Sequence, residues 1–183
     1  LLLSVLSFLL TLPLFAPWSF WPAGYVAFAP WLIAIVSTSR ARWAYAASGL
    51  FGLLFFLTHW RWVLGTTPPG YVAGSAYLAL HCVLAAFPIR HLVRRRGVPM
   101  TLAFPLVWVL LEFFRSRGPL AFPWFLLGHS QIRALPMVQL ADITGVYGIT
   151  FVVAMVNGLI VDLLLGRLRP TSLAPLPPRR LIT

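Results

Sequence analysis

The chain has 183 residues, of which 60% are hydrophobic and 9% are charged, and its mean hydropathy is +0.89. A soluble domain could not expose so much apolar surface, so this composition indicates an integral membrane protein. All 14 basic residues are arginines, and the formal net charge is +11. In a soluble protein that charge would favour nucleic acid binding, but here the arginines cluster between apolar segments, which favours contact with anionic membrane lipids and no nucleic acid partner.

Apolar segments of spanning length recur along the chain and predict an all-α, polytopic transmembrane bundle. We expect about six spans, near residues 1–16, 20–37, 43–64, 71–93, 98–115 and 142–165. We interpret residues 1–16, which begin without methionine, as a clipped spanning helix rather than a signal peptide. Residues 167–183, which contain four prolines, are expected to form a truncated cytoplasmic linker after a transmembrane domain at residues 1–166.

The arginines are distributed unevenly between the two predicted membrane faces. Ten fall on one face and four on the other; the four are Arg61, Arg115, Arg117 and Arg133. Because positive residues mark the cytoplasmic side, both ends of this segment are expected inside the cell, with residues 65–70 and 116–141 outside.

Residues 116–141 are too long for a tight turn and too interrupted for a full span. Leu120 to Leu127 is apolar but short and broken by Pro123, and the polar run Gly128 to Gln131 follows it. Such a segment either lies in the outer interface or enters the membrane and returns. It is either a packed plug without chemistry or one wall of a lipid-binding cleft, and the sequence leaves both interpretations open.

Three residues near the end of the fifth predicted span share one helical face. Glu112 and Arg115 lie three residues apart, and Trp108 precedes Glu112 by one turn. A carboxylate and a guanidinium at this spacing can pair, and near the interface such a pair costs less than at the membrane centre. We therefore expect a structural ion pair rather than a catalytic one.

The other two carboxylates have simple structural interpretations. Asp142 precedes the last predicted span, and its position predicts an N-terminal cap for that helix. Asp162 lies near the inner end of the same span, and we expect it close to Arg167 and Arg169. Neither residue is assigned a catalytic role.

No metal site or cofactor is expected from the remaining polar residues. The four histidines lie on different spans or faces, without ligand spacing to a carboxylate: His59, His81, His91 and His129. The single cysteine, Cys82, excludes an intrachain disulfide framework. His81 is adjacent to it, but neighbouring helical side chains point about 100° apart, so we interpret Cys82 as a buried apolar residue.

Several short motifs occur in a specific order along most of the chain. They are Phe104 to Arg115, Phe122-Pro123-Trp124, Leu127 to Gln131, Gln139 to Gly148 and Asn157-Gly158, with weaker matches at Phe15-Ala16-Pro17 and Trp21-Pro22. This ordered set resembles the membrane domain of the bacterial apolipoprotein N-acyltransferases. Where this chain has His129, other members of that family can carry tyrosine.

The resemblance implies an enzyme of the bacterial plasma (inner) membrane. Such an enzyme transfers a fatty acyl chain from a phospholipid donor to the α-amino group of the diacylglyceryl-modified N-terminal cysteine of a lipoprotein. In the family, an outer nitrilase-like domain supplies a Glu-Lys-Cys triad that works through a thioester. This chain contains no lysine and its cysteine is predicted within a span, so we expect a fragment that is inactive alone.

In this interpretation the chain anchors the catalytic domain and shapes a lipid-accessible cleft beneath it. Trp124, His129 and Gln131 are the candidates near the cleft, and Trp108, Glu112, Arg115 and Asp142 are the candidates for supporting the outer segment. Two alternatives remain open at this stage: a self-contained transporter or channel, and a non-catalytic scaffold that binds lipid.

Overall fold

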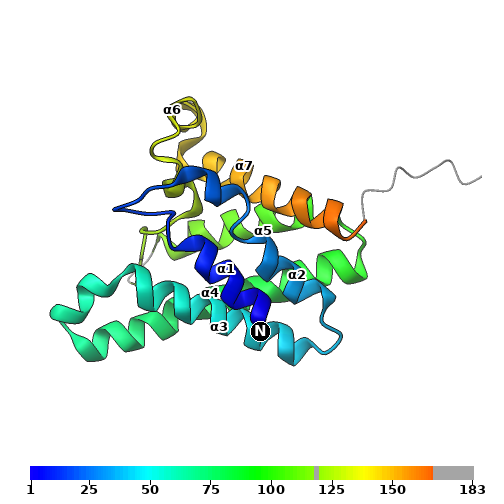
Figure 1. Ribbon diagram of the computed structural model, residues 1–183, viewed down its shortest axis with the longest axis horizontal. Helices are drawn as coiled ribbons and strands as arrows, with labels where there is room; N and C mark the ends of the chain where they lie inside the picture. The colour runs from blue at the N-terminus through cyan, green and yellow to red at the C-terminus, as the bar shows by residue number, and fades with distance from the viewer. Residues whose placement is uncertain (118–119, 167–183) are drawn as a thin grey trace, which may run out of the picture.

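The computed structural model describes residues 1–117 and 120–166, so the predicted linker at 167–183 lies outside the described part (Figure 1). Within those residues, helices are the only regular elements, which confirms the all-α class. The elements are α1 Leu2–Thr11, η1 Trp21–Tyr25, α2 Ala29–Ser37, α3 Ala41–His59, η2 Arg61–Gly65, α4 Pro68–Arg95, α5 Met100–Arg115, η3 Leu127–Gln131, α6 Leu135–Val138 and α7 Ala141–Leu164, where η denotes a 3-10 helix.

Three of the described helices, α3, α4 and α7, are long and apolar enough to cross a membrane. The longest, α4, has 28 residues, which corresponds to about 42 Å and exceeds a hydrocarbon layer of about 30 Å. The chain is therefore a helical membrane protein. The total of six spans stays a prediction, because α1 and α2 are much shorter than the segments expected there.

Prolines explain why the first two predicted spans are shorter or divided. Helix α1 ends at Thr11, two residues before Pro13, and the predicted span at 20–37 is split into η1 and α2. Pro22 lies in η1, and Pro30 lies in the first turn of α2. Proline lacks an N–H and clashes with the preceding turn, so it is tolerated at a helix start but interrupts a continuous helix.

Side chains from other helices satisfy the backbone groups that this interruption leaves. The Asn157 amide nitrogen donates to the Gly24 carbonyl at 2.8 Å, and its Oδ1 accepts from the Phe28 N–H at 2.9 Å. Ser7 Oγ donates to the Ala27 carbonyl at 2.6 Å. Irregular backbone at membrane depth persists only where such partners replace the missing helical bonds. Asn157 therefore fixes the η1–α2 junction to α7.

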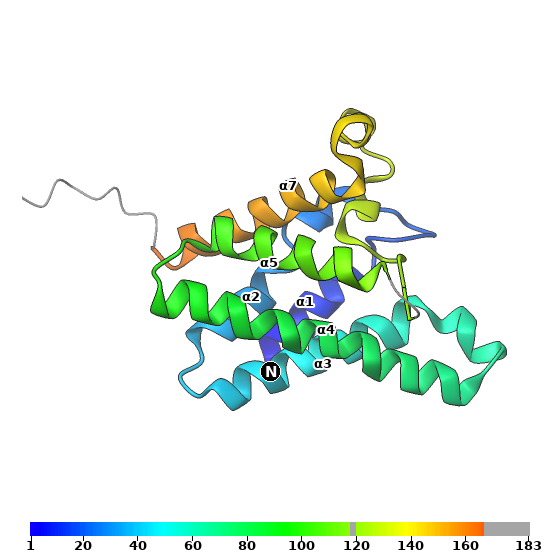
Figure 2. The same ribbon diagram turned by 180° about the vertical axis from the view of Figure 1, so that it is seen from behind.

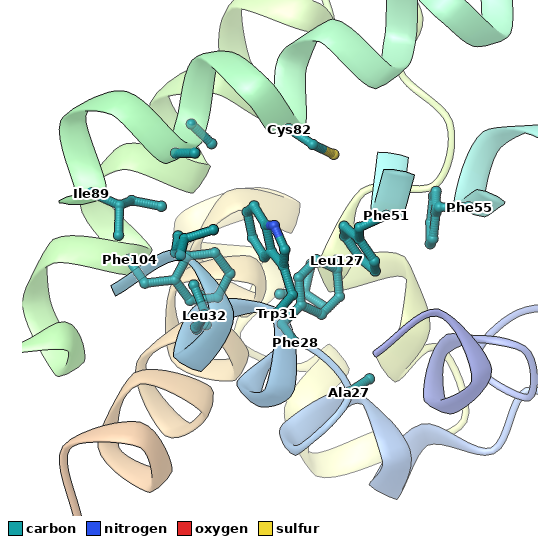
Figure 3. Packing of buried hydrophobic residues seen from close by; sticks show 14 of the residues in the cluster. Ala27, Phe28, Trp31, Leu32, Phe51, Phe55, Cys82, Ile89, Phe104 and Leu127 are labelled. Carbon is teal, nitrogen blue, oxygen red and sulfur yellow. The ribbon is translucent and has the colours of Figure 1, made fainter. Parts of the chain in front are cut away.

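The helices surround a core of aromatic rings contributed mainly by α2, α3 and α5. Trp31 is fully buried and stacks on Phe51, with ring centroids 5.1 Å apart, and Figure 3 shows both beside Phe28 and Phe104. The Trp31 indole N–H donates to Ser48 Oγ at 3.0 Å, so its polar atom is not left unpaired. Helix α2 contacts α3, α4 and α7 and thus lies centrally.

Helices α5 and α7 run side by side (Figure 2). A Cβ added at Gly158 would lie 2.4 Å from the Met100 carbonyl oxygen, so only glycine allows this approach. Asp162, fully buried one turn later, accepts hydrogen bonds from the backbone N–H of Met100 at 3.0 Å and of Thr101 at 2.8 Å. Asp162 therefore caps α5.

The expected proximity of Asp162 to Arg167 and Arg169 stays a prediction, because both arginines fall outside the described residues. The partners of the carboxylate are the first amides of α5 and the Thr101 hydroxyl, which donates at 2.7 Å. A buried carboxylate needs several donors, and the start of a neighbouring helix supplies unpaired N–H groups at the right place.

We predict that Asn157→Leu lowers the stability of the fold while preserving side-chain size. The substitution leaves the Phe28 N–H and the Gly24 carbonyl buried without partners, which costs about 2 kcal/mol or more. The measurement is thermal unfolding of the detergent-solubilised protein, followed by circular dichroism. The control is Gln139→Leu, which removes the same amide at an exposed position. Equal unfolding temperatures for the two variants would contradict this role of Asn157.

Candidate functional site

The connection between α5 and α7, which is called the outer connection after its predicted side, folds over one end of the bundle. There η3 contacts both η1 and α7. Residues 120–126 form no regular element around Pro123, and the short helix α6 lies at the tip of the connection (Figure 1). Several large apolar side chains remain exposed along it: Leu120, Trp124, Ile132 and Leu135. Exposed apolar groups beside polar ones are typical of a segment at a membrane interface, and the depth of this segment in a bilayer stays a prediction.

A buried carboxylate ties this segment to the bundle. Glu112, only 2% exposed, accepts hydrogen bonds at Oε1 from the Trp108 indole N–H at 2.9 Å and from the Leu127 backbone N–H at 2.7 Å. Its Oε2 accepts from the Thr150 hydroxyl at 2.8 Å. One side chain therefore links α5, η3 and α7. Since all three partners donate, the arrangement matches an acceptor-only, ionised carboxylate.

Thr150 extends this link by one more bond. Its hydroxyl oxygen accepts a hydrogen bond from the Gly128 backbone N–H at 2.8 Å, while its O–H donates to Glu112. The first two amides of η3 are thus bound to the same carboxylate, one directly and one through a hydroxyl. Sequence analysis missed Thr150, because a single threonine within an apolar helix carries no periodic or motif signal.

The structure corrects the expected ion pair between Glu112 and Arg115. Arg115 is also buried, but it donates to the Trp124 carbonyl at 3.1 Å and lies over the Phe56 ring, 5.6 Å from its centroid. The two charged groups share a helical face, yet each has its own partners in the outer segment. The backbone of that segment supplies both donors and acceptors, so the charged groups bind it rather than each other.

The three predicted cleft residues differ in their exposure, and their role in a cleft stays a prediction. Trp124 and His129 are exposed, whereas Gln131 is fully buried. The Gln131 amide nitrogen donates to the Trp21 carbonyl at 3.0 Å and to Ser130 Oγ at 2.9 Å. Gln131 therefore fastens η3 to η1, and only Trp124 and His129 are placed to meet a ligand from outside.

The predicted capping role of Asp142 is not what the structure shows. Helix α7 begins at Ala141, its N-cap position is Leu140, and no side chain caps it. The backbone leaves the helical conformation at Gly145, with φ 64° and ψ −172°, a region that is essentially reserved for glycine. Asp142 thus belongs to an isolated turn ahead of the continuous part of α7, and its side chain is exposed.

A small cavity lies beneath the outer segment, beside the Glu112 cluster. Its volume is about 20 Å³, which is room for about one water molecule. Aromatic rings make up most of its wall, and a few polar groups border it: Glu112, Arg115, His81 and Cys82. Among residues 1–117 and 120–166, no three His, Cys, Asp or Glu side chains lie close enough together to hold a metal ion.

Comparison with known proteins assigns the chain to a family. The family model described as the apolipoprotein N-acyltransferase N-terminal domain matches residues 6–159. The chain belongs to the apolipoprotein N-acyltransferase family. A relative from Geobacter metallireducens, named apolipoprotein N-acyltransferase, is 35% identical over 90% of this chain, and one from Pasteurella multocida with the same name is 31% identical over 88%.

The matched range, residues 6–159, spans Glu112 with its partners Trp108, Leu127 and Thr150, and also Asn157 and Gly158. The chain spans about a third of the length of these relatives, 33% and 32% respectively. The described helices therefore correspond to the N-terminal membrane part of the family, which confirms the resemblance seen in the sequence.

We predict that Glu112→Gln loosens η3 without unfolding the bundle. Glutamine is uncharged and has an NH₂ group in place of one carboxylate oxygen. The hydrogen bonds that hold the amides of Leu127 and Gly128, directly or through Thr150, are therefore weakened. We expect a loss of about 2 kcal/mol, or roughly 30-fold faster hydrogen exchange at these two amides. Hydrogen–deuterium exchange of residues 126–131 measures this effect.

Asp142→Asn is the matched control, because it makes the same chemical change at an exposed carboxylate. Its exchange rates in residues 126–131 should equal those of the unchanged protein. If Glu112→Gln also leaves them unchanged, the carboxylate does not hold the outer segment.

Proposed function

We propose that this chain is the membrane domain of an enzyme that transfers a fatty acyl chain from a phospholipid to the α-amino group of a lipoprotein's N-terminal, diacylglyceryl-modified cysteine. The family match over residues 6–159, with relatives named apolipoprotein N-acyltransferase, carries this proposal. Because the chain spans about a third of those relatives, the activity is assigned to a longer protein that contains it.

The residues of this chain support a division of labour with another domain. The sequence contains no lysine, and its single cysteine, Cys82, is buried within α4. A thioester mechanism requires an accessible thiolate and positive charge positioned near the oxyanion. Without a lysine or an accessible cysteine, this chain's contribution is to anchor the catalytic domain and to present the lipid substrates to it.

The outer face has the properties that such a presenting surface needs. Trp124, 52% exposed, and His129 stand on the segment that Glu112 holds in place. A hollow of about 530 Å³ lies between η1 and α6, with apolar walls that include Trp21 and Leu135. Concave apolar surfaces bordered by a few polar groups are typical of sites for amphiphilic ligands. We assign the wall of the lipid cleft to this face.

The charge distribution supports an orientation in the bacterial plasma membrane. The α2–α3 turn, the α4–α5 turn and the end of α7 lie together at the left of Figure 2, opposite the outer connection. The two turns carry five arginines: Arg40, Arg42, Arg94, Arg95 and Arg96. By the positive-inside rule that end is cytoplasmic, so the outer connection faces the opposite side, where lipoproteins are modified.

The coding sequence after Thr183 tests the enzymatic proposal directly. We expect an open frame that encodes a further span and an outer domain with separated Glu, Lys and Cys residues. The measurement is sequencing of the downstream DNA. A stop codon at or just after Thr183 would leave no acyl-transfer machinery and would contradict the proposal.

We also predict that Trp124→Ala and His129→Ala, made in the full-length enzyme, each reduce kcat/KM for acyl transfer. Loss of one apolar contact with the substrate corresponds to about a tenfold reduction for Trp124→Ala. The readout is N-acylation of a diacylglyceryl peptide in mixed micelles. Trp43→Ala, which removes an equally exposed indole at the other end of the bundle, is the control. Unchanged acylation and folding in both variants would remove these residues from the cleft.

A further inference from the structure

A polar hollow lies at the arginine-rich end of the bundle, opposite the outer connection. It has a volume of about 510 Å³ and lies between the α2–α3 turn and the last turns of α4. Basic and aromatic side chains line it, among them Tyr45, Phe87, Arg90, His91, Arg94 and Arg95. The acyl-transfer proposal makes no use of this hollow.

Two of these arginines are fixed in place by the end of α2. Arg90 donates to the Ile35 carbonyl at 2.6 Å and to the Ser39 carbonyl at 2.7 Å, and Arg94 donates to the Thr38 carbonyl at 2.5 Å. These bonds satisfy carbonyls that the end of α2 leaves unpaired. A guanidinium has five N–H donors, so both arginines keep donors for another acceptor. The hollow therefore holds preorganised positive charge.

Among residues 1–117 and 120–166, no acidic side chain lines this hollow. Of the three side-chain carboxylates, Glu112 and Asp142 lie at the outer end, and the buried Asp162 accepts hydrogen bonds from the start of α5. The exposed Arg95 adds a further positive charge to the wall. The charge of the hollow is thus left for a ligand to neutralise.

The apolar part of the hollow indicates what kind of anion fits. Phe87 is 63% exposed and lies one turn before His91 on the same helix, closer to the middle of α4. The half-buried Tyr45 contributes a second ring to the wall of the hollow. Positive groups next to exposed rings match an amphiphile, with its phosphate at the arginines and its acyl chains along the rings.

We propose that this hollow binds an anionic phospholipid of the cytoplasmic leaflet, represented by phosphatidylglycerol. Arg95 and the remaining donors of Arg90 and Arg94 bind the phosphodiester, and Phe87 contacts an acyl chain. Basic hollows between helices on the cytoplasmic side are suited to such headgroups. The site is separate from the acyl-transfer cleft and does not depend on it.

The test compares lipid binding by the full-length protein and two arginine variants. Native mass spectrometry of the protein in neutral detergent, titrated with phosphatidylglycerol, gives the dissociation constant of the first bound lipid. We expect about fivefold weaker binding for Arg95→Gln, which removes one phosphate contact and leaves the capping of α2 intact. Arg96→Gln, on the same turn but outside the wall, should bind as the unchanged protein does.

Two further titrations identify the ligand class. Phosphatidylethanolamine, which has the same chains and phosphate but no net charge, should bind more weakly than phosphatidylglycerol and lose less affinity in Arg95→Gln, because its ammonium group offsets the charge of the phosphate. Millimolar inorganic phosphate should not displace the lipid, because it cannot contact Phe87. Equal losses in Arg95→Gln and Arg96→Gln, equal affinity for the two lipids, or displacement by phosphate would each overturn the proposal.

Discussion

The structure depends on two carboxylates that are buried in an apolar bundle and directed at the backbone of other elements. Glu112 on α5 binds the first amides of η3, and Asp162 on α7 binds the first amides of α5. A carboxylate removed from water is tolerated only when donors replace its hydration, and each of these two has three. Helix α5 is thereby fastened at both of its ends.

This choice of interaction follows from the solvent. Within a bilayer, apolar packing gives helices little reason to prefer each other over lipid, so polar contacts and close backbone approach have to specify the arrangement. Asn157 and Gly158 combine the two at consecutive positions of α7, since the amide ties η1 to α2 while the glycine admits the start of α5. Hydrogen bonds to a charged group contribute about 1.5–3 kcal/mol each, enough to fix a register.

Composition and hydropathy were sufficient to predict the class of fold and the three long helices. The segments predicted at 43–64, 71–93 and 142–165 differ from α3, α4 and α7 by a few residues at either end. The first two segments are less regular than predicted because Pro13, Pro22 and Pro30 limit helix length, and hydropathy does not report this effect.

The site was predictable only in part, because its contacts join residues far apart in the chain. Glu112 was predicted to support the outer segment, but its partners Leu127 and Thr150 follow it by 15 and 38 residues. Helical spacing predicted Arg115 as the partner of Glu112 instead, because spacing relates residues within one helix. It carries no information about the segments that fold over that helix. Asp142 does not cap the continuous part of α7 because the backbone leaves the helical conformation at Gly145. The backbone angles of a glycine within an apolar segment cannot be predicted from the sequence.

The cap on α5 has a consequence for how the protein is assembled. Met100 and Thr101 emerge from the ribosome 62 and 61 residues before Asp162, respectively, so α5 enters the membrane with its first amides unsatisfied. The carboxylate of α7 is equally unsatisfied until it meets them. Each helix removes the other's cost on insertion, so the two are expected to leave the translocon as a pair, with α5 held at its edge until α7 arrives.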